Sequence, residues 1–222
     1  MDENKYISDD EARRAITEIG RRMYIKNFIA GYDGNITCKV ADDTIIATPS
    51  GVSKGFLAED SLIKMRLDGT VIAGQGKPSS EIRMHLRVYQ ENPEVMAVVH
   101  AHPPAATAFA VARRPLDMPV YPAAIVNLGP VPCVPYQTPG SQAVADSIAP
   151  YVPNHKAVLL ANHGAVTWAG SPAEAFTLME ILEHYATILL YTEMSTLEAC
   201  PLSKSQMEDL TVGRGKAGTD DE

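Results

Sequence analysis

The sequence predicts a single domain of the α/β or α+β class, in which helices pack against a sheet rich in antiparallel hairpins. The chain has 222 residues, the size of one large domain, and neither a linker nor an internal repeat divides it. Hydrophobic residues make up 45% and charged residues 21% of the chain, which supplies a core and excludes disorder over the whole length. Helix-like and strand-like segments follow one another in a mixture typical of these two classes.

The first predicted element is a helix that begins after Ser8. Ser8 and Glu11 have the spacing of a capping box, in which each side chain accepts a hydrogen bond from a backbone N–H at the helix start. Apolar residues then recur at intervals of four, three and four, as on one buried helix face: Ala12, Ile16, Ile19 and Met23. We expect the helix to end near Gly31, where the loop GYDGN begins.

Two hairpins are predicted next, followed by alternating helices and strands. The β-type segments 36–40 and 44–48 are joined by a polar turn, and the segment 62–73 carries Asp68-Gly69 at its turn. The later elements are a helix from Ser79 and Ser80 to Gln90, a strand at 97–100, a helix from His102 to Arg113, an extended segment at 131–136, a helix at 141–151, a strand at 157–161 and a helix at 171–191.

The end of the chain is predicted to differ from the folded domain. We expect the domain to cover residues 1–202 and residues 203–222 to form a mobile tail. This last segment has few apolar residues, so it has little to bury against the core.

Composition excludes several classes of partner. The chain has 19 Lys and Arg against 27 Asp and Glu, and a formal charge of -8 disfavours binding to nucleic acid or anionic membrane, because both are polyanions. No stretch approaches the roughly 20 apolar residues that span a bilayer, and the acidic N-terminus does not resemble a signal peptide. The three cysteines form no CxxC pair. We therefore expect a reduced, cytoplasmic protein whose partner is a small molecule or another protein.

Three histidines follow apolar strand-like runs. His100 and His102 lie in VVHAH, and residues at i and i+2 of a strand point to the same face. His163 follows the run AVLLA in the same way, with Gly164 behind it to let the chain turn away. Each could be an ordinary strand-end histidine bonded to the backbone. The set of three favours a metal site, because three imidazoles with open coordination positions are typical of a catalytic zinc or similar divalent ion.

A carboxylate is needed if such a metal is to carry out proton chemistry. Glu81 lies in KPSSEIRMH, in the first turn of a predicted helix, where the macrodipole favours a negative charge. It could serve only as a helix-start acid. His85 lies one turn later on the same face and is a rival metal ligand that spacing alone does not exclude.

Three short turns could form a cradle for an anion. Backbone N–H groups and side-chain donors at such turns and at a helix N-terminus can hold phosphate without Lys or Arg. Individually these residues are ordinary turn and cap residues, and only their combination with the histidines points to phosphate. The residues are Gly34, Asn35, Ser50, Gly51, Ser79 and Ser80.

Four blocks of the sequence resemble the class II aldolase/adducin family. They are GYDGNIT, TPSG, KPSSEIRMHLRVYQENPEVMAVVHAHPPAATAFA and LLANHGAVTWAGSPAEAFTLMEILEHYA, in the family's order and within about residues 10–195. SSE, VHxH and NHG together form a specific set. The resemblance implies a three-layer α/β/α fold with a mostly antiparallel sheet of nine strands flanked by helices. It also implies a homotetramer with active sites between subunits.

The resemblance assigns roles to the candidate residues. His100, His102 and His163 match zinc ligands, and Glu81 matches an acid/base that can also ligate the metal when the site is empty. Tyr121 matches a tyrosine that reaches a neighbouring subunit's site and protonates the aldehyde oxygen. His85 falls outside the ligand set and is interpreted as structural. The positions that match the phosphate site are Gly34, Asn35, Ser50, Gly51, Ser79 and Ser80.

Within the family, the four blocks resemble L-fuculose-phosphate aldolase and its relatives. This likeness implies zinc-dependent cleavage of a ketose 1-phosphate into dihydroxyacetone phosphate (DHAP) and an aldehyde. The related 4-epimerases have Asp in place of Glu81 and a further Asp near the position of Tyr121, so this chain favours aldol cleavage. The last tyrosine is Tyr191, whereas fuculose-phosphate aldolase has a tail tyrosine that closes over the substrate. A rhamnulose, 5-deoxyribulose or 5-deoxyxylulose phosphate is therefore an alternative substrate.

Other activities on the same scaffold remain open at this point. One is a sugar-phosphate 4-epimerase, and another is a methylthioribulose-phosphate-type dehydratase. A non-catalytic module like the adducin head domain is disfavoured, because such domains have lost zinc ligands and all three histidines are present here.

Overall fold

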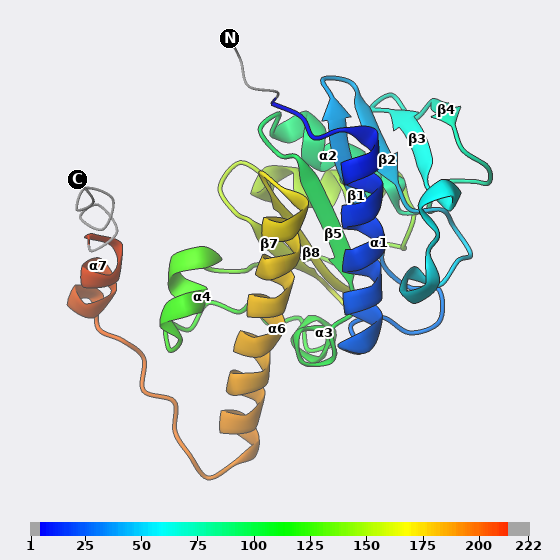
Figure 1. The fold of residues 1–222 in the computed structure, drawn as a ribbon. Coiled ribbons are helices and arrows are strands. Elements are labelled where there is room, and N and C mark those ends of the chain that lie inside the picture. Colours follow the sequence, from blue (N-terminus) through cyan, green and yellow to red (C-terminus); the bar gives the residue numbers. More distant parts are fainter. Residues whose placement is uncertain (1–4, 213–222) are drawn as a thin grey trace.

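The computed structural model describes residues 5–212, which form one eight-stranded sheet between two layers of helices (Figure 1). The helices are α1 (Asp9–Ile25), α2 (Ile82–Glu91), α3 (Pro104–Val111), α4 (Pro122–Asn127), α5 (Gln142–Ile148), α6 (Pro172–Met194) and α7 (Lys204–Val212). The strands are β1 (Asn35–Ala41), β2 (Thr44–Ala47), β3 (Ile63–Arg66), β4 (Val71–Ala73), β5 (Ala97–Ala101), β6 (Cys133–Val134), β7 (Ala157–Leu160) and β8 (Gly164–Ala169).

The sheet has the order β4-β3-β2-β1-β5-β8-β7-β6. Neighbouring strands are antiparallel, except that β6 and β7 are parallel. The predicted α/β class is confirmed, with eight strands among the described residues instead of nine. Two isolated antiparallel bridges lie outside these strands, one between Pro49 and Pro78 and the other between Leu116 and Val131. Prolines flank both Leu116 and Val131 and lack the N–H that a longer ladder needs.

The two helical layers give the sheet two separate cores. On β5, Ala97 and Val99 pack in the cluster that contains α1, α3 and α6, whereas Val98 packs with α2 and α5. In Figure 1, α1 and α6 lie in front of the sheet and α2 behind it. Because side chains alternate along a strand, His100 points to the same face as Val98. The α2 side of the sheet is therefore the side on which the histidines can meet.

The N-terminal helix forms as predicted, although it ends earlier. The Ser8 hydroxyl accepts from the Glu11 N–H at 3.3 Å, and the Glu11 carboxylate accepts from the Ser8 N–H at 2.8 Å, which completes the capping box. The helix ends at Ile25, six residues before Gly31. Asn27 adopts a left-handed conformation (φ 58°) there, as asparagine tolerates, and this turns the chain out of the helix.

The sequence prediction missed strand β8. Gly164 was expected to turn the chain away after His163, which is wrong, because it begins β8 and pairs with Leu160 of β7. Asn162, in the left-handed region (φ 57°), makes the turn instead. Gly164 is needed for a different reason: a Cβ there would lie 2.5 Å from the His102 ring. The missing side chain makes room for a site histidine.

Helix α2 begins at Ile82, not at the serines. Ser79, Ser80 and Glu81 form the turn that precedes it, and Glu81 is the N-cap residue without capping the helix through its side chain. The prediction of Glu81 in the first helical turn is therefore wrong by one position. The consequence is functional, since the Glu81 carboxylate is free to point away from its own helix.

Two short helices, α4 and α7, were also not predicted. Helix α7 lies within the expected tail 203–222, and the Ser203–Gln206 pair caps it by exchanging hydrogen bonds of 2.8 and 3.3 Å. The first part of that segment is thus helical, and residues 213–222 lie outside the described residues. Among residues 5–212, no helix has both the length and the apolar character needed to cross a membrane.

Candidate active site

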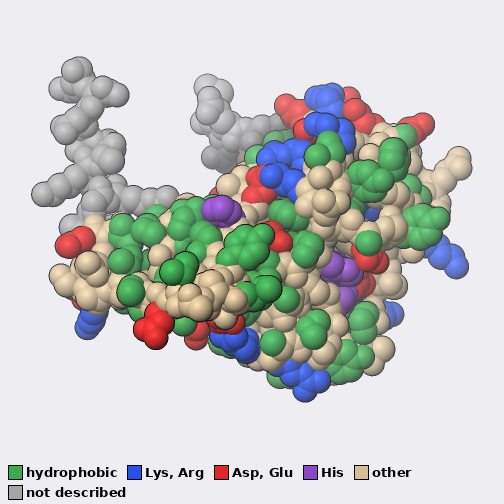
Figure 2. Space-filling model, turned by 90° about the horizontal axis from the view of Figure 1, so that it is seen from below, with side chains coloured by type: hydrophobic (Ala, Val, Ile, Leu, Met, Phe, Trp, Pro, Cys, Tyr) green, Lys and Arg blue, Asp and Glu red, His purple; other side chains and the backbone are tan. Residues whose placement is uncertain are grey.

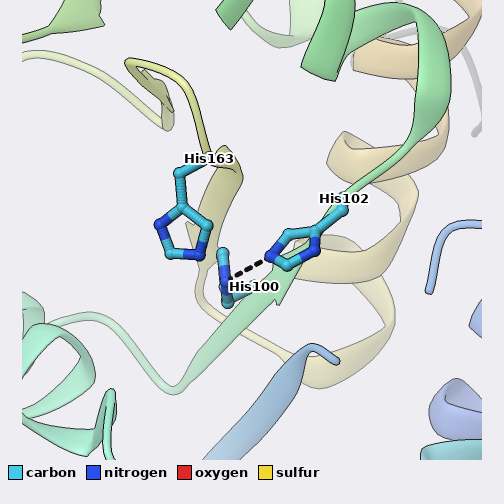
Figure 3. A group of neighbouring side chains, drawn as sticks. All are labelled: His100, His102 and His163. Carbon is cyan, nitrogen blue, oxygen red and sulfur yellow. Dashed lines mark hydrogen bonds between the residues drawn. The ribbon is translucent and has the colours of Figure 1, made fainter. Parts of the chain in front are cut away.

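The three predicted histidines come together at one end of adjacent strands (Figure 3). His100 is in β5, His102 directly follows it, and His163 lies in the turn between β7 and β8. Since β5 and β8 are neighbours in the sheet, the turn brings His163 beside the end of β5. The ring centroids are 4.8 to 4.9 Å apart in all three pairs, and one nitrogen of each ring lies within 4.8 Å of the others.

The outer nitrogens of two rings are held by hydrogen bonds to oxygen. His100 Nδ1–H donates to the carbonyl of Ala165 at 2.9 Å, and His102 Nδ1–H donates to the Asp33 carboxylate at 3.2 Å. These bonds leave Nε2 of both rings facing inward, 3.1 Å apart. Fixing the outer nitrogen to a carbonyl or carboxylate is how proteins orient metal-ligating histidines. The donor set and its orientation therefore fit a divalent metal ion.

Glu81 closes the site from the α2 side. One carboxylate oxygen lies 3.1 Å from His163 Nε2 and the other 3.2 Å from His100 Nε2. The second oxygen also accepts a hydrogen bond of 2.9 Å from the Asn35 side-chain amide. The carboxylate thus lies where it can ligate a metal or exchange a proton with a group bound there. These contacts give Glu81 a position that a simple helix-start acid would not need.

The pKa directions show how strongly these groups interact. Burial opposes the charge on Glu81, but the charge on His100 and the hydrogen bonds of His100 and His163 outweigh burial and hold the pKa of Glu81 below its usual range. Burial likewise opposes the charge on His100, but Glu81 outweighs it and raises the His100 pKa. Burial, with repulsion from the other two rings, lowers the pKa of His102 to about 4. A proton and a metal ion would therefore compete for the inner nitrogen of His100.

A cavity of about 380 Å³ opens beside the histidines. Histidine side chains reach the surface on the face shown in Figure 2, with acidic side chains next to them. All six residues predicted to bind phosphate line this cavity, together with Glu81, His102 and His163, while His100 is fully buried behind them. The six are Gly34, Asn35, Ser50, Gly51, Ser79 and Ser80. Three loops that are distant in sequence thus form one pocket beside the candidate metal site.

Gly34 is required by the geometry of this pocket. It adopts a left-handed conformation (φ 72°), and a Cβ at this position would lie 2.9 Å from the His100 carbonyl and 2.7 Å from the Ile29 side chain. Only glycine allows the loop to approach β5 this closely. The close approach brings Asn35, the next residue, into contact with Glu81.

Lys54 is a pocket residue that sequence reasoning missed. Its side chain is buried, and its ammonium donates to the carbonyls of Tyr32 at 2.7 Å and Val52 at 2.8 Å, so it ties together two loops of the pocket. Burial lowers the Lys54 pKa, and the nearby charges of Asp33 and Glu81 oppose that shift. A lone lysine in the segment GVSKGF gives no signal of burial. Its role follows only from the fold.

Two other predicted residues lie outside the pocket. Tyr121 is the N-cap residue of α4, and its ring lies 5.5 Å from that of His184 in α6. Its predicted role in a neighbouring subunit concerns an assembly that a single chain does not contain, so it stays a prediction. His85 is fully buried and is not part of the three-histidine group. Its nitrogens contact Asn35 and Thr37 instead.

The chain is similar to known proteins over most of its length. The sequence profile described as Class II Aldolase and Adducin N-terminal domain matches residues 14–190. The chain is 34% identical over 187 residues to 3-oxo-tetronate 4-phosphate decarboxylase of Pectobacterium atrosepticum, which covers 82% of this chain and 85% of the relative. It is also 34% identical over 200 residues to 5-deoxy-D-ribulose 1-phosphate aldolase of Bacillus thuringiensis serovar kurstaki, covering 89% and 92% of the two chains.

A solved structure of L-fuculose 1-phosphate aldolase has the same fold. The TM-score is 0.86 at 28% sequence identity, with 95% of this chain and 99% of the other chain covered. These similarities therefore extend over nearly the whole folded part of the chain, including every loop that lines the pocket.

Proposed function

The chain belongs to the class II aldolase and adducin N-terminal domain family, and from this premise we propose that it is a metal-dependent carbon–carbon lyase acting on a sugar phosphate. One observation carries the proposal. The inner nitrogens of three histidines and the Glu81 carboxylate converge beside a cavity lined by three serines, two glycines and Asn35. Such a set can bind a metal, move a proton and hold a phosphate within one small volume.

The three histidines would hold a divalent metal, which we propose to be one zinc ion per chain, and the metal would supply Lewis-acid stabilisation of negative charge on substrate oxygens. Glu81 would take up and return a proton at the reacting carbon, because its carboxylate lines the same cavity and lies within 3.2 Å of the His100 and His163 rings. Asn35 would hold that carboxylate in place.

The pocket loops would bind the phosphate group. Ser50, Ser79 and Ser80 supply hydroxyl donors, and Gly34 and Gly51 bring backbone close to the cavity. Lys54, buried behind these loops, adds a positive charge. A phosphate fixed at this place would hold the adjoining carbonyl carbon next to the histidines, which is the positioning that carbon–carbon cleavage needs.

We propose aldol cleavage of a ketose 1-phosphate, such as L-fuculose 1-phosphate or a 5-deoxyketose 1-phosphate. Breaking the C3–C4 bond leaves its electron pair on the phosphorylated three-carbon fragment, which becomes DHAP once Glu81 returns a proton to C3. The departing half becomes an aldehyde when the C4 hydroxyl gives up its proton. Tyr121 of a neighbouring subunit would exchange a proton with the C4 oxygen. This shared role is the reason for proposing a homotetramer with active sites between subunits. A cytoplasmic location is retained as part of this proposal.

Decarboxylation is the second candidate, favoured by the 34% identity to 3-oxo-tetronate 4-phosphate decarboxylase. Loss of carbon dioxide from a 3-oxo acid of this kind also leaves an electron pair on a phosphorylated three-carbon fragment, and protonation again gives DHAP. The two reactions differ in the leaving half. Carbon dioxide departs without a hydroxyl proton, so decarboxylation needs Glu81 and the phosphate pocket but no group in the place of Tyr121.

One assay separates the candidates. The purified protein, loaded with zinc, is offered a panel of ketose 1-phosphates and 3-oxo-tetronate 4-phosphate, and DHAP is followed by coupled reduction. Carbon dioxide is measured in parallel. We expect DHAP and an aldehyde from at least one ketose 1-phosphate, without carbon dioxide. DHAP only from the 3-oxo acid would establish the second candidate, and no DHAP from any member would overturn the lyase proposal.

A further inference from the structure

A chain of buried polar side chains runs from Glu81 into the interior between α2 and β1. Glu81, His85 and Tyr89 are spaced four residues apart, so they form one stripe at the start and along the length of α2. Asn35 and Thr37, two residues apart on β1, point to the same face of the sheet. The stripe and the strand face each other, and the polar side-chain atoms of these five residues all have hydrogen-bond partners.

The contacts form an unbroken sequence. Asn35 Nδ2 donates to Glu81 at 2.9 Å, and Asn35 Oδ1 lies 2.5 Å from His85 Nε2. His85 Nδ1 lies 2.9 Å from the Thr37 hydroxyl, which lies 2.8 Å from the Tyr89 hydroxyl. His85 is 0% exposed, and Asn35, Thr37 and Tyr89 are at most 3% exposed. With so little access for water, these groups depend on each other for hydrogen bonds.

The donor and the acceptor of each hydrogen bond in this series can be assigned by starting from Glu81. A carboxylate accepts hydrogen bonds, so the Asn35 amide must present its NH₂ group to Glu81 and its oxygen to His85. His85 Nε2 must then carry a hydrogen. Burial lowers the His85 pKa to about 3, which keeps the ring neutral and makes Nδ1 an acceptor from Thr37. Thr37, having used its only hydrogen, accepts from Tyr89.

We propose that His85 is a positioning residue for the candidate acid/base: its Nε2–H holds the Asn35 amide in the orientation that places the NH₂ group on Glu81. This proposal rests on the proposed function, in which Glu81 transfers the proton. If the Asn35 amide reversed, its oxygen would face the Glu81 carboxylate, and the two acceptors would repel each other. His85 prevents this reversal, because its Nε2–H accepts no hydrogen bond from an amide NH₂.

The geometry of amide side chains supplies a matched pair of variants. A glutamine amide nitrogen lies about as far from Cβ as Nε2 of histidine does, and an asparagine amide nitrogen about as far as Nδ1. His85→Gln therefore keeps a donor for Asn35, whereas His85→Asn keeps only a partner for Thr37. Met84→Ala is the packing control, since Met84 is buried on the same helix in the apolar core.

We expect His85→Asn to lower kcat roughly 10- to 100-fold with KM changed less than about threefold, as displacement of a reacting group does. His85→Gln should recover to within about threefold of the wild-type kcat. Zinc content should stay equal in both, since His85 is not a ligand. Met84→Ala should lower Tm and leave kcat per folded chain unchanged. Equal kcat in His85→Asn and wild type, or an equal loss in both His85 variants at equal Tm, would overturn the proposal.

A second measurement needs no enzymatic activity. In protein labelled with ¹⁵N-histidine and ¹⁵N-asparagine, long-range proton–nitrogen correlation should show His85 with hydrogen on Nε2 and not on Nδ1. The Asn35 NH₂ protons should exchange slowly with solvent in wild type and His85→Gln, and faster in His85→Asn. Hydrogen on Nδ1 of His85 would refute the proposal. A wild-type protein that cleaves no substrate but shows this tautomer would count against the proposed function alone.

Discussion

Replacing Glu81 by glutamine removes one proton acceptor and changes little else in the site. The variant's amide oxygen must face the Asn35 NH₂ group, because the wild-type carboxylate oxygen accepts from it at 2.9 Å. Its amide nitrogen then faces His163 Nε2, which lies 3.1 Å from the other carboxylate oxygen. The Asn35 contact can persist as a hydrogen bond, and in the metal-free protein the new amide nitrogen can donate to His163 Nε2, so the variant should fold and keep the three histidines in place.

The expected loss is that of general acid–base catalysis. Glu81→Gln should lower the cleavage rate by roughly 10²- to 10⁴-fold, or about 3 to 5 kcal/mol of transition-state stabilisation. Coupled DHAP detection measures the rate, and elemental analysis should still find about one zinc per chain. Glu81→Asp is the matched control, because it keeps the acceptor but withdraws it by about 1 Å, and it should lose less. A Glu81→Gln rate within a few fold of wild type, with zinc and Tm unchanged, would refute the assignment of Glu81.

Four further outcomes are expected. Chelator treatment should abolish activity and added zinc should restore it, and full activity after verified metal removal would contradict the histidine site. Tyr121→Phe should slow aldol cleavage but spare hydrogen exchange at C3 of DHAP, and mixing it with Glu81→Gln chains should restore part of the cleavage if subunits share sites. Glu183→Ala should lower the free energy of unfolding by about 1 to 2 kcal/mol and the Tm by roughly 2 to 8 °C. The reason is that the Glu183 carboxylate accepts hydrogen bonds of 2.9 and 2.8 Å from two backbone N–H groups at the start of α3. An unchanged Tm would contradict this role of Glu183. The pKa of His85 is about 3 in the folded protein and roughly 6.5 in the unfolded chain, so the unfolded chain binds more protons between these values. The free energy of unfolding should therefore fall as the pH drops below about 6.5, by up to about 1.4 kcal/mol per pH unit. Denaturant midpoints of His85→Gln should fall less steeply over the same pH range.

Local signals predicted most of the helices and the first hairpins. The capping box at Ser8 and Glu11 and the turn at Asp68-Gly69 depend on residues within a few positions of each other, and both form as expected. Strand β8 was missed because the turn was expected at Gly164, whereas Asn162 adopts the left-handed conformation and turns the chain two residues earlier, so that Gly164–Ala169 forms the strand. The short helix α4 has no side-chain cap and too few residues for a periodic pattern.

The candidate site was predictable to the extent that its residues lie at strand ends. His100, His102 and His163 each follow an apolar run, and the structure brings them together as a group that could bind a metal. Lys54 and the interior role of His85 could not be predicted in this way. A lysine next to glycine reads as exposed, and a histidine one turn from Glu81 reads as a possible ligand. Burial, which decides both cases, depends on segments distant in the chain.

The sequence by itself determined which chemical groups are available and at what spacing, and this was enough to predict an α/β protein with three histidines, a carboxylate and a phosphate-binding set of turns. Only the tertiary structure decided which of their atoms face each other. The physical reason is that a side chain's role depends on its partners and on water: His85 and His102 are the same residue type, but one is sealed between α2 and β1 and the other borders a cavity. Hydrogen-bond direction along Glu81, Asn35 and His85 exists only once β1 and α2, more than 40 residues apart, have packed together.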